Sequence, residues 1–167
     1  MKKEKEKITI NWSSELFSST TNITTKSKSI GKLINESFSQ YTNAEFENKK
    51  FRFFKKGIFE TTTLISDLED NKIIGRIIYD SWKTKAYIEL YDNKYTWKSE
   101  SFWTGKWSLS SKTEKLMDFK SNFSSGVINS ITNDSLLILT GLHITNYYLR
   151  TILLFLLIIL IPILMNR

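Results

Sequence analysis

A basic cluster in the first third of the chain is the strongest candidate for binding chemistry. Five cations lie close together with no acidic residue among them, namely Lys49, Lys50, Arg52, Lys55 and Lys56. On a strand, Lys50 and Arg52 point to the same outward face, and a turn that ends at Gly57 presents Lys55 and Lys56 together. Such a surface can bind lipid phosphates on an anionic leaflet, with about 1 kcal/mol from each basic side chain.

The alternative explanation for this cluster is a solvated outer surface. Charged side chains along a sheet discourage pairing with further strands, and the sequence favours this explanation over lipid binding. Lys83 and Lys85 would extend a lipid-binding patch if one exists.

The chain offers little material for catalysis. It has no cysteine, which excludes thiol chemistry, disulfides and thiolate metal sites, and its single histidine, His143, excludes a multi-histidine metal site. A lone histidine without a partner motif is usually structural, and the motifs of nucleophile elbows, phosphate loops and zinc proteases are missing from the sequence. A glycosidase-type pair of carboxylates stays open, because their separation in space decides it. We expect a non-enzymatic protein with no cofactor and no metal.

The net charge of +7 permits binding to nucleic acid. The charges are scattered, however, and there is no recognition helix and no strand with the aromatic pattern of an RNA-binding sheet. We therefore expect no nucleic-acid partner. An anionic membrane lipid is the partner that the residues suggest, and they identify no protein partner. Four tryptophans can form a stacking platform or, as we favour, pack across strands: Trp82, Trp97, Trp103 and Trp107.

The elements that must position these residues are short strands. Turn signals recur every eight to twelve residues or so, with no amphipathic helix pattern between them, as in an antiparallel meander. Residues 86–91 alternate apolar and polar side chains, and Asp92-Asn93 joins them to the next strand in a predicted hairpin. The last strand in this series is predicted at Leu136 to Ile144.

So many short strands need their edges covered, and closure into a barrel is the simplest solution. We predict a mainly β fold, a closed antiparallel β-barrel of about twelve strands around a central hydrophobic helix. The predicted organisation is a charged N-terminal segment at 1–7, a barrel domain at 8–149 and a hydrophobic helix at 150–167.

The stretch from Ile152 to Met165 has no polar side chain. A helix that is apolar on every side lies in a membrane or in a protein core. About fourteen residues span roughly 21 Å, whereas a bilayer core of roughly 30 Å needs about twenty. As a C-terminal membrane anchor the helix would have Arg150 to snorkel, and Tyr147 and Tyr148 as interface aromatics.

The same stretch can instead fill the barrel. A barrel of about twelve strands is too wide for its own side chains to fill, and a central helix can occupy the space. Length favours this role slightly over the membrane. In either role, the residues expected on the helix are Ile152, Leu153, Leu156, Leu157, Leu160 and Pro162.

The order of features resembles the tubby C-terminal-like superfamily, which includes LURP-one-related proteins and phospholipid scramblases. The segments that carry the resemblance are residues 75–82 (GRIIYDSW), 85–88 (KAYI), 95–97 (YTW), 103–109 (WTGKWSL) and 136–142 (LLILTGL), running into the apolar end. The chain is most similar to short bacterial members, over roughly residues 50–165. The resemblance implies a twelve-stranded barrel around a hydrophobic C-terminal helix.

The sequence departs from that family in ways that limit the transfer of function. It lacks the cysteines that scramblases carry for lipidation, and no acidic run matches a calcium loop. Calcium-dependent scrambling is therefore not implied, and the phosphoinositide-binding positions of tubby are not matched residue by residue.

Two functions follow as expectations. The first is a tubby-like barrel that associates with membranes and binds anionic headgroups through basic residues. The second is a membrane protein anchored at its C-terminus, whose β domain is a protein-interaction module. No apolar segment follows the charges of residues 1–7, so we expect no signal peptide and a cytoplasmic or membrane-associated location.

Overall fold

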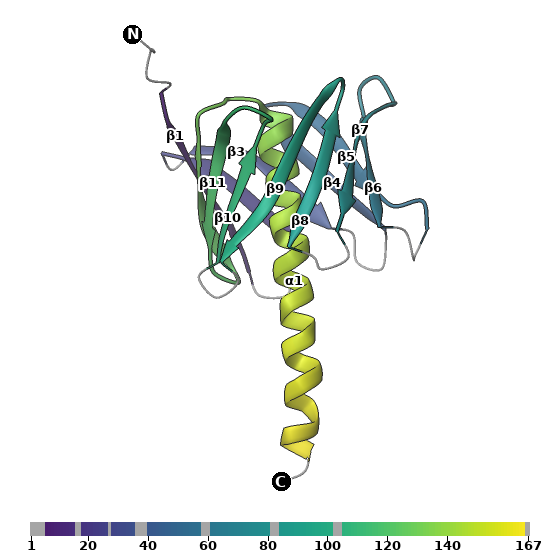
Figure 1. Cartoon of the computed structure of the whole chain (residues 1–167), viewed down its shortest axis with the longest axis vertical. Coiled ribbons are helices and arrows are strands. Elements are labelled where there is room, and N and C mark those ends of the chain that lie inside the picture. Colours follow the sequence, from purple (N-terminus) through teal and green to yellow (C-terminus); the bar gives the residue numbers. More distant parts are fainter. Residues whose placement is uncertain are drawn as a thin grey trace.

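The computed structural model describes residues 6–15, 18–26, 28–35, 40–57, 61–80, 84–101 and 105–165. These form twelve strands followed by one helix (Figure 1). The elements are β1 (Ile8–Ser14), β2 (Thr20–Thr25), β3 (Lys28–Asn35), β4 (Tyr41–Phe46), β5 (Lys49–Phe54), β6 (Thr62–Asp67), β7 (Lys72–Tyr79), β8 (Lys85–Leu90), β9 (Asn93–Ser101), β10 (Lys106–Ser110), β11 (Lys115–Ser121), β12 (Ser125–Ser130) and α1 (Ser135–Met165).

The strands form one closed antiparallel barrel in which each strand pairs with its neighbours in sequence. Closure comes from β1, which pairs with β12 in a register that places Ile8 opposite Ser130. The predicted barrel of about twelve strands around a central helix is confirmed. Because a closed barrel has no free edge, each described strand has a hydrogen-bonded partner on both sides.

Alternation of side chains decides which residues enter the barrel. In β8, Ala86, Ile88 and Leu90 are buried, whereas Tyr87 between them is exposed. Successive side chains of a strand point to opposite faces, so the apolar set lines the interior and the polar set meets solvent. The predicted faces of this strand are therefore confirmed.

The barrel interior is filled by the first half of α1. Asp134 caps the helix, because its Oδ1 accepts a hydrogen bond from the backbone N–H of Leu137 at 3.1 Å. From Ser135 to Leu149 nearly every side chain is buried among inward-facing strand residues. The contact is close: a Cβ on Gly141 would lie 2.4 Å from Cζ of Phe119, so only glycine fits there.

The predicted strand at Leu136 to Ile144 is wrong, since these residues are helical. A continuous apolar run is compatible with a buried strand and with a buried helix, and periodicity does not separate them when every side is apolar. The helix also begins at Ser135 and not at residue 150 as predicted.

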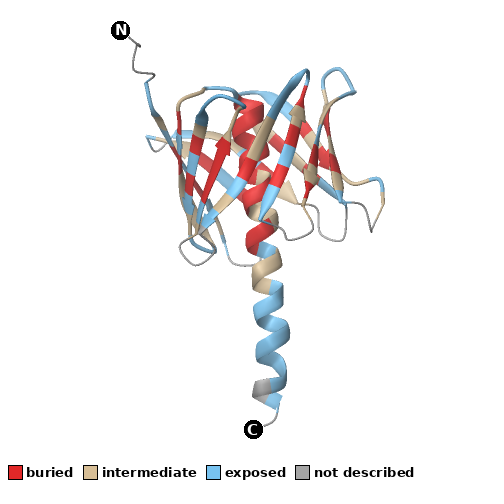
Figure 2. Cartoon of the chain, in the orientation of Figure 1, coloured by how far each residue is buried: buried red, intermediate tan, exposed pale blue. Residues whose placement is uncertain are grey.

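Of the two roles left open for the last apolar stretch, barrel filling, which its length slightly favoured, does not fit the structure. In the segment 154–161, which includes Leu156, Leu157 and Leu160, the side chains are 39–64% exposed. Ile152 and Leu153 are half-buried at the point where α1 leaves the barrel, and Pro162 is exposed near its end. Figure 2 shows the change along one helix from buried to exposed.

The two ends of the barrel differ in what they carry. We call the end at which α1 leaves the barrel the exit rim; odd-numbered strands end there and even-numbered strands begin there (Figure 1). The opposite end, where Asp134 leads into α1, is the far rim. Each strand-to-strand connection can therefore be assigned to one rim.

Candidate membrane-facing end of the barrel

The exposed half of α1 is the most unusual surface of the protein. From Ile152 to Met165 the sequence has no polar side chain, and the described side chains beyond Leu153 are exposed on all sides of the helix. A helix that docks on a protein is amphipathic, with polar residues opposite its apolar stripe. By length and composition, α1 is long and apolar enough to cross a membrane.

Hydrogen bonds fix the level at which the helix leaves the barrel. The side-chain amide of Asn146 donates to Oγ1 of Thr21 at 3.0 Å. The hydroxyl of Tyr148 donates to the carbonyl of Lys85 at 3.0 Å. Nη2 of Arg150 donates to the carbonyl of Ser18 at 3.3 Å. Residues 146–150 therefore lie at the exit rim, and the apolar stretch begins directly beyond them.

The structure does not bring the five predicted basic residues together. Strand β5 begins with Lys49 and Lys50 at the far rim and leads to Lys55 and Lys56 at the exit rim. Six residues of extended chain separate Lys49 from Lys55 by about 20 Å. Arg52 lies between them, where its Nε donates to Oδ1 of Asn43 at 2.9 Å and its guanidinium lies 5.4 Å from the ring of Tyr41.

The two lysines at the exit rim differ from each other. Lys56 is exposed. Nζ of Lys55 lies 4.9 Å from the ring centroid of Tyr147 and 5.7 Å from that of Tyr79, which is cation–π geometry. Lys55 thus connects β5 to a helix residue and to β7. Lys83, which was expected to extend the patch, lies outside the described residues.

A second basic surface, which the sequence does not reveal, crosses four neighbouring strands near the exit rim. We call it the lysine band; it consists of Lys85 on β8, Lys98 on β9, Lys106 on β10 and Lys120 on β11. All four side chains are exposed on the outer face. Only the strand register brings them together, since they are far apart in sequence. Of the four, the sequence analysis identified only Lys85 as a possible binding residue.

The register places like charges in direct opposition within the lysine band. Lys85 lies opposite Lys98, and Lys106 lies opposite Lys120. Ser108 lies opposite Lys98 and two residues from Lys106, so Lys98 and Lys106 are diagonal neighbours. Within the described part of the chain, none of the four lysines forms an ion pair.

His143 lies inside the barrel on α1. Its ring stacks on Phe53 with 4.4 Å between centroids and 8° between planes. Burial, with smaller contributions from the charges of Lys55 and Arg150, lowers the pKa of His143 from 6.5 to about 3. The imidazole is therefore neutral at physiological pH and is part of the packing between helix and barrel.

Two of the four tryptophans form part of the buried core. Trp97 stacks on Tyr148 at 4.7 Å and on Trp107 at 6.0 Å. Its Nε1 donates to Oγ1 of Thr145 at 3.3 Å, so the indole N–H is satisfied by the helix. The packing role predicted for these two is confirmed, and Trp82 and Trp103 lie outside the described residues.

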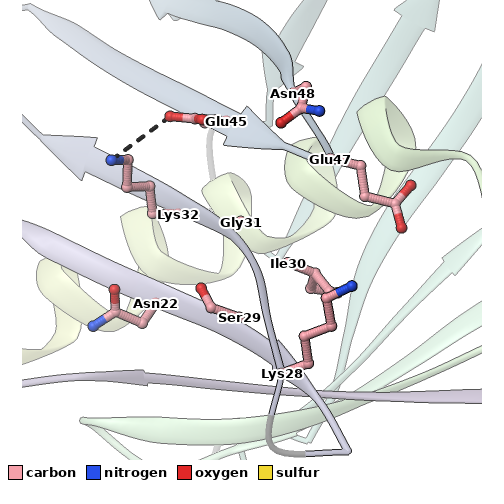
Figure 3. Close-up of a pocket in the computed structure, with 9 residues that line it drawn as sticks. All are labelled: Asn22, Lys28, Ser29, Ile30, Gly31, Lys32, Glu45, Glu47 and Asn48. Atoms are coloured by element: carbon pink, nitrogen blue, oxygen red, sulfur yellow. Dashed lines mark ion pairs between the residues drawn. The ribbon is translucent and has the colours of Figure 1, made fainter.

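A shallow groove lies on the outer surface of β2, β3 and β4 near the far rim (Figure 3). Its lysines face glutamates: Nζ of Lys32 lies 3.6 Å from Oε2 of Glu45, and Lys28 and Glu47 lie at its edge. The charges balance, and the ion pair is exposed and hence weakly stabilising. In the part of the chain that the structure describes, no group of three or more metal-ligating residues occurs.

Comparisons with known proteins found no matching protein-family model, curated protein or solved structure.

Proposed function

We propose that this chain is a non-enzymatic β-barrel module that the exposed half of α1 anchors in a membrane. The observation that carries the proposal is the continuation of the core helix beyond the barrel as an exposed segment that is apolar on every side. The proposal assigns the apolar stretch beyond residue 152 to the membrane, whereas the preceding half of the same helix fills the barrel.

The free energy of exposure supports the membrane as the environment of this segment. Residues 154–161 expose eight large apolar side chains. Burying a Leu, Ile or Phe side chain fully contributes about 1.5–3 kcal/mol, so half-exposed side chains in this number cost on the order of 10 kcal/mol in water. Lipid removes that cost on all faces of a helix at once, and the helix satisfies its own backbone hydrogen bonds.

A closed barrel around a helix is the architecture that the resemblance to the tubby C-terminal-like superfamily implies. This agreement supports a second part of the proposal, that the chain is a short member of that group. The closed wall and filled interior also support a binding role at the membrane surface over a catalytic one.

Anchoring can be tested with two substitutions in the middle of the exposed segment, Leu156→Lys and Ile159→Lys together. A lysine at the centre of a membrane helix costs about 2.5–3.5 kcal/mol, so we expect the double variant to leave the membrane fraction. The wild-type chain should stay in membranes washed with alkaline carbonate. The matched control is Leu156→Ala with Ile159→Ala, which keeps the segment uncharged and should remain in the membrane.

Barrel folding provides the second readout of this experiment. The extracted lysine variant should keep the buried environment of Trp97 and Trp107. Trp97 stacks on Tyr148 in the buried half of α1, and Trp107 stacks on Trp97, so neither contact involves the substituted residues. Recovery of the wild-type chain as a soluble monomer without detergent would refute anchoring.

A further inference from the structure

The lysine band has no explanation in the stability of the barrel. Like charges directly opposite each other on neighbouring strands destabilise a sheet, and here two such pairs are adjacent. Nearby acidic side chains compensate only in part: Glu100 and Asp118 both pair with Lys115, and the charge of Lys98 makes only a minor contribution to lowering the pKa of Glu100. Four exposed lysines without described ion pairs remain on one face.

The band lies at the height where a membrane surface would be. Lys85 and Lys106 are the first residues of their strands at the exit rim, and Lys120 is the residue before the end of β11. The carbonyl of Lys85 accepts the hydroxyl of Tyr148, two residues before Arg150. About one helical turn, roughly 5 Å, then separates Tyr148 from the start of the apolar stretch at Ile152.

The apolar stretch is too short to hold the barrel away from the lipid. The apolar stretch from Ile152 to Met165 spans about 21 Å as a helix, less than a hydrocarbon core of roughly 30 Å. The exit rim is therefore drawn into the headgroup layer, which is roughly 5–8 Å thick on each side. Lysines at that height lie closer to the lipid phosphates than the Debye length of about 8 Å, so salt does not fully screen their attraction.

The far rim has charges of both signs, and its exposed lysines include Lys28, Lys49, Lys72 and Lys112. Its described turns carry exposed acidic side chains, namely Glu47, Glu69, Asp70, Asp92, Glu114 and Asp134. The far rim therefore does not concentrate one sign of charge, whereas the lysine band at the exit rim has two pairs of directly opposed lysines.

We infer that the exit rim rests on an anionic leaflet, with the lysine band against the phosphates of acidic phospholipids. This inference rests on the proposed anchoring by α1 and adds the lipid class and the orientation of the barrel. The partner is a surface of acidic lipid and not one headgroup in a pocket, because the lysines lie in a line across four strands.

An exposed aromatic residue at the exit rim, Phe123, supports the same orientation. Phe123, in the turn between β11 and β12, is 52% exposed and lines a small pocket with Arg150 and Leu153. Aromatic residues are enriched at membrane–water interfaces.

The test uses single-cysteine reporters in the full chain, which has no cysteine of its own. An environment-sensitive fluorophore is attached at Phe123→Cys on the exit rim, Asp92→Cys on the far rim or Leu157→Cys on the exposed helix. Each protein is reconstituted in vesicles of phosphatidylcholine alone or with phosphatidylserine. The vesicles contain a lipid with a quencher near the headgroup for Phe123→Cys and Asp92→Cys, and on the acyl chain for Leu157→Cys. We expect quenching at Phe123→Cys in the phosphatidylserine vesicles, less in the neutral vesicles, and none at Asp92→Cys.

Charge removal identifies the surface responsible. In the Phe123→Cys protein, Lys85, Lys98, Lys106 and Lys120 are all replaced by Gln. The ratio of barrels whose exit rim rests on the lipid surface to barrels held away from it should fall by on the order of 10³-fold. Quenching at Phe123→Cys should then drop to the level seen at Asp92→Cys on the far rim. The matched control replaces four exposed far-rim lysines by Gln, Lys28, Lys49, Lys72 and Lys112, and should keep the quenching despite the same loss of charge.

The reporters separate the two proposals. Quenching at Leu157→Cys without any at Phe123→Cys overturns the seated orientation and leaves anchoring intact. Equal quenching at Phe123→Cys in both vesicle types, or quenching that survives loss of the band, overturns the role of acidic lipid. Absence of quenching at Leu157→Cys overturns the anchor and the inference that rests on it.

Discussion

His143 shows how one buried side chain links the barrel to solution conditions. It stacks on Phe53, with the charges of Lys55 and Arg150 nearby, and its pKa lies at about 3 in the folded protein against 6.5 ordinarily. Between these two values the unfolded chain binds a proton that the folded chain does not. Stability is therefore fully present above about pH 6.5 and falls as the pH is lowered from there towards 3.

The prediction at this scale concerns His143→Gln, which removes the titrating group. The wild-type protein in detergent should lose stability between pH 7 and pH 5 more steeply than the variant, because only the wild-type unfolded state takes up this proton. Urea unfolding followed by tryptophan fluorescence at several pH values measures the two slopes. Parallel slopes would mean that the imidazole is accessible and titrates normally in the folded state.

At the scale of elements, one helix has two environments that its composition does not distinguish. Leu142 is completely buried in the barrel and Leu157 is 39% exposed outside it, although both are leucines in apolar sequence. The packing contribution of each therefore depends on its position relative to the exit rim. Barrel stability should come from the first half of α1 alone.

A matched pair of substitutions tests this division. Leu142→Ala should lower the free energy of unfolding by about 2–5 kcal/mol, the usual cost of a cavity at a buried leucine. Leu157→Ala should leave the urea unfolding of the barrel within about 0.5 kcal/mol of wild type. Equal losses in the two variants would contradict the separation of core and exposed segment.

The sequence predicted the strands better than the helix. Alternation in residues 86–91 assigned the correct face to each side chain, because a strand with one buried face has a period of two. The run from Leu136 to Ile144 lacks that information, since a segment enclosed by a barrel has no polar side. The register was equally inaccessible: Lys85 and Lys98 become neighbours only through the pairing of β8 with β9.

The five cations considered as one possible patch show a related limit of the sequence. Closeness in sequence suggested closeness in space, but an extended strand separates its ends by about 3.3 Å per residue. Lys49 and Lys55 consequently lie at opposite rims. The basic surface that the barrel does assemble draws one residue from each of four strands.

At the scale of the whole molecule, the barrel and its core helix form a unit that is complete without the exposed segment. Residues 135–149 fill the interior, and the hydrogen bonds of Asn146, Tyr148 and Arg150 close the exit rim. The remainder of α1 makes few contacts with the strands. Removal of that remainder should not expose the core.

Truncation after Thr151 should therefore give a folded, water-soluble barrel with a urea midpoint close to that of the full chain in detergent. Truncation after Asp134 removes the helix that fills the interior and should prevent folding. Size-exclusion chromatography and near-ultraviolet circular dichroism distinguish a compact barrel from an unfolded or aggregated chain. Aggregation of the variant truncated after Thr151 would show that residues beyond Thr151 belong to the core.

The helix runs without interruption from Ser135 to Met165, with its single proline, Pro162, near the very end. Under the proposed anchoring, the barrel and the membrane segment have no hinge between them and must tilt together. Membrane helices incline by about 20° on average and change their inclination with bilayer thickness. A change in bilayer thickness would therefore tilt the whole barrel, which moves one side of its wall towards the lipid and the other side away from it. Bilayer thickness would then control which part of the outer wall is accessible to a binding partner.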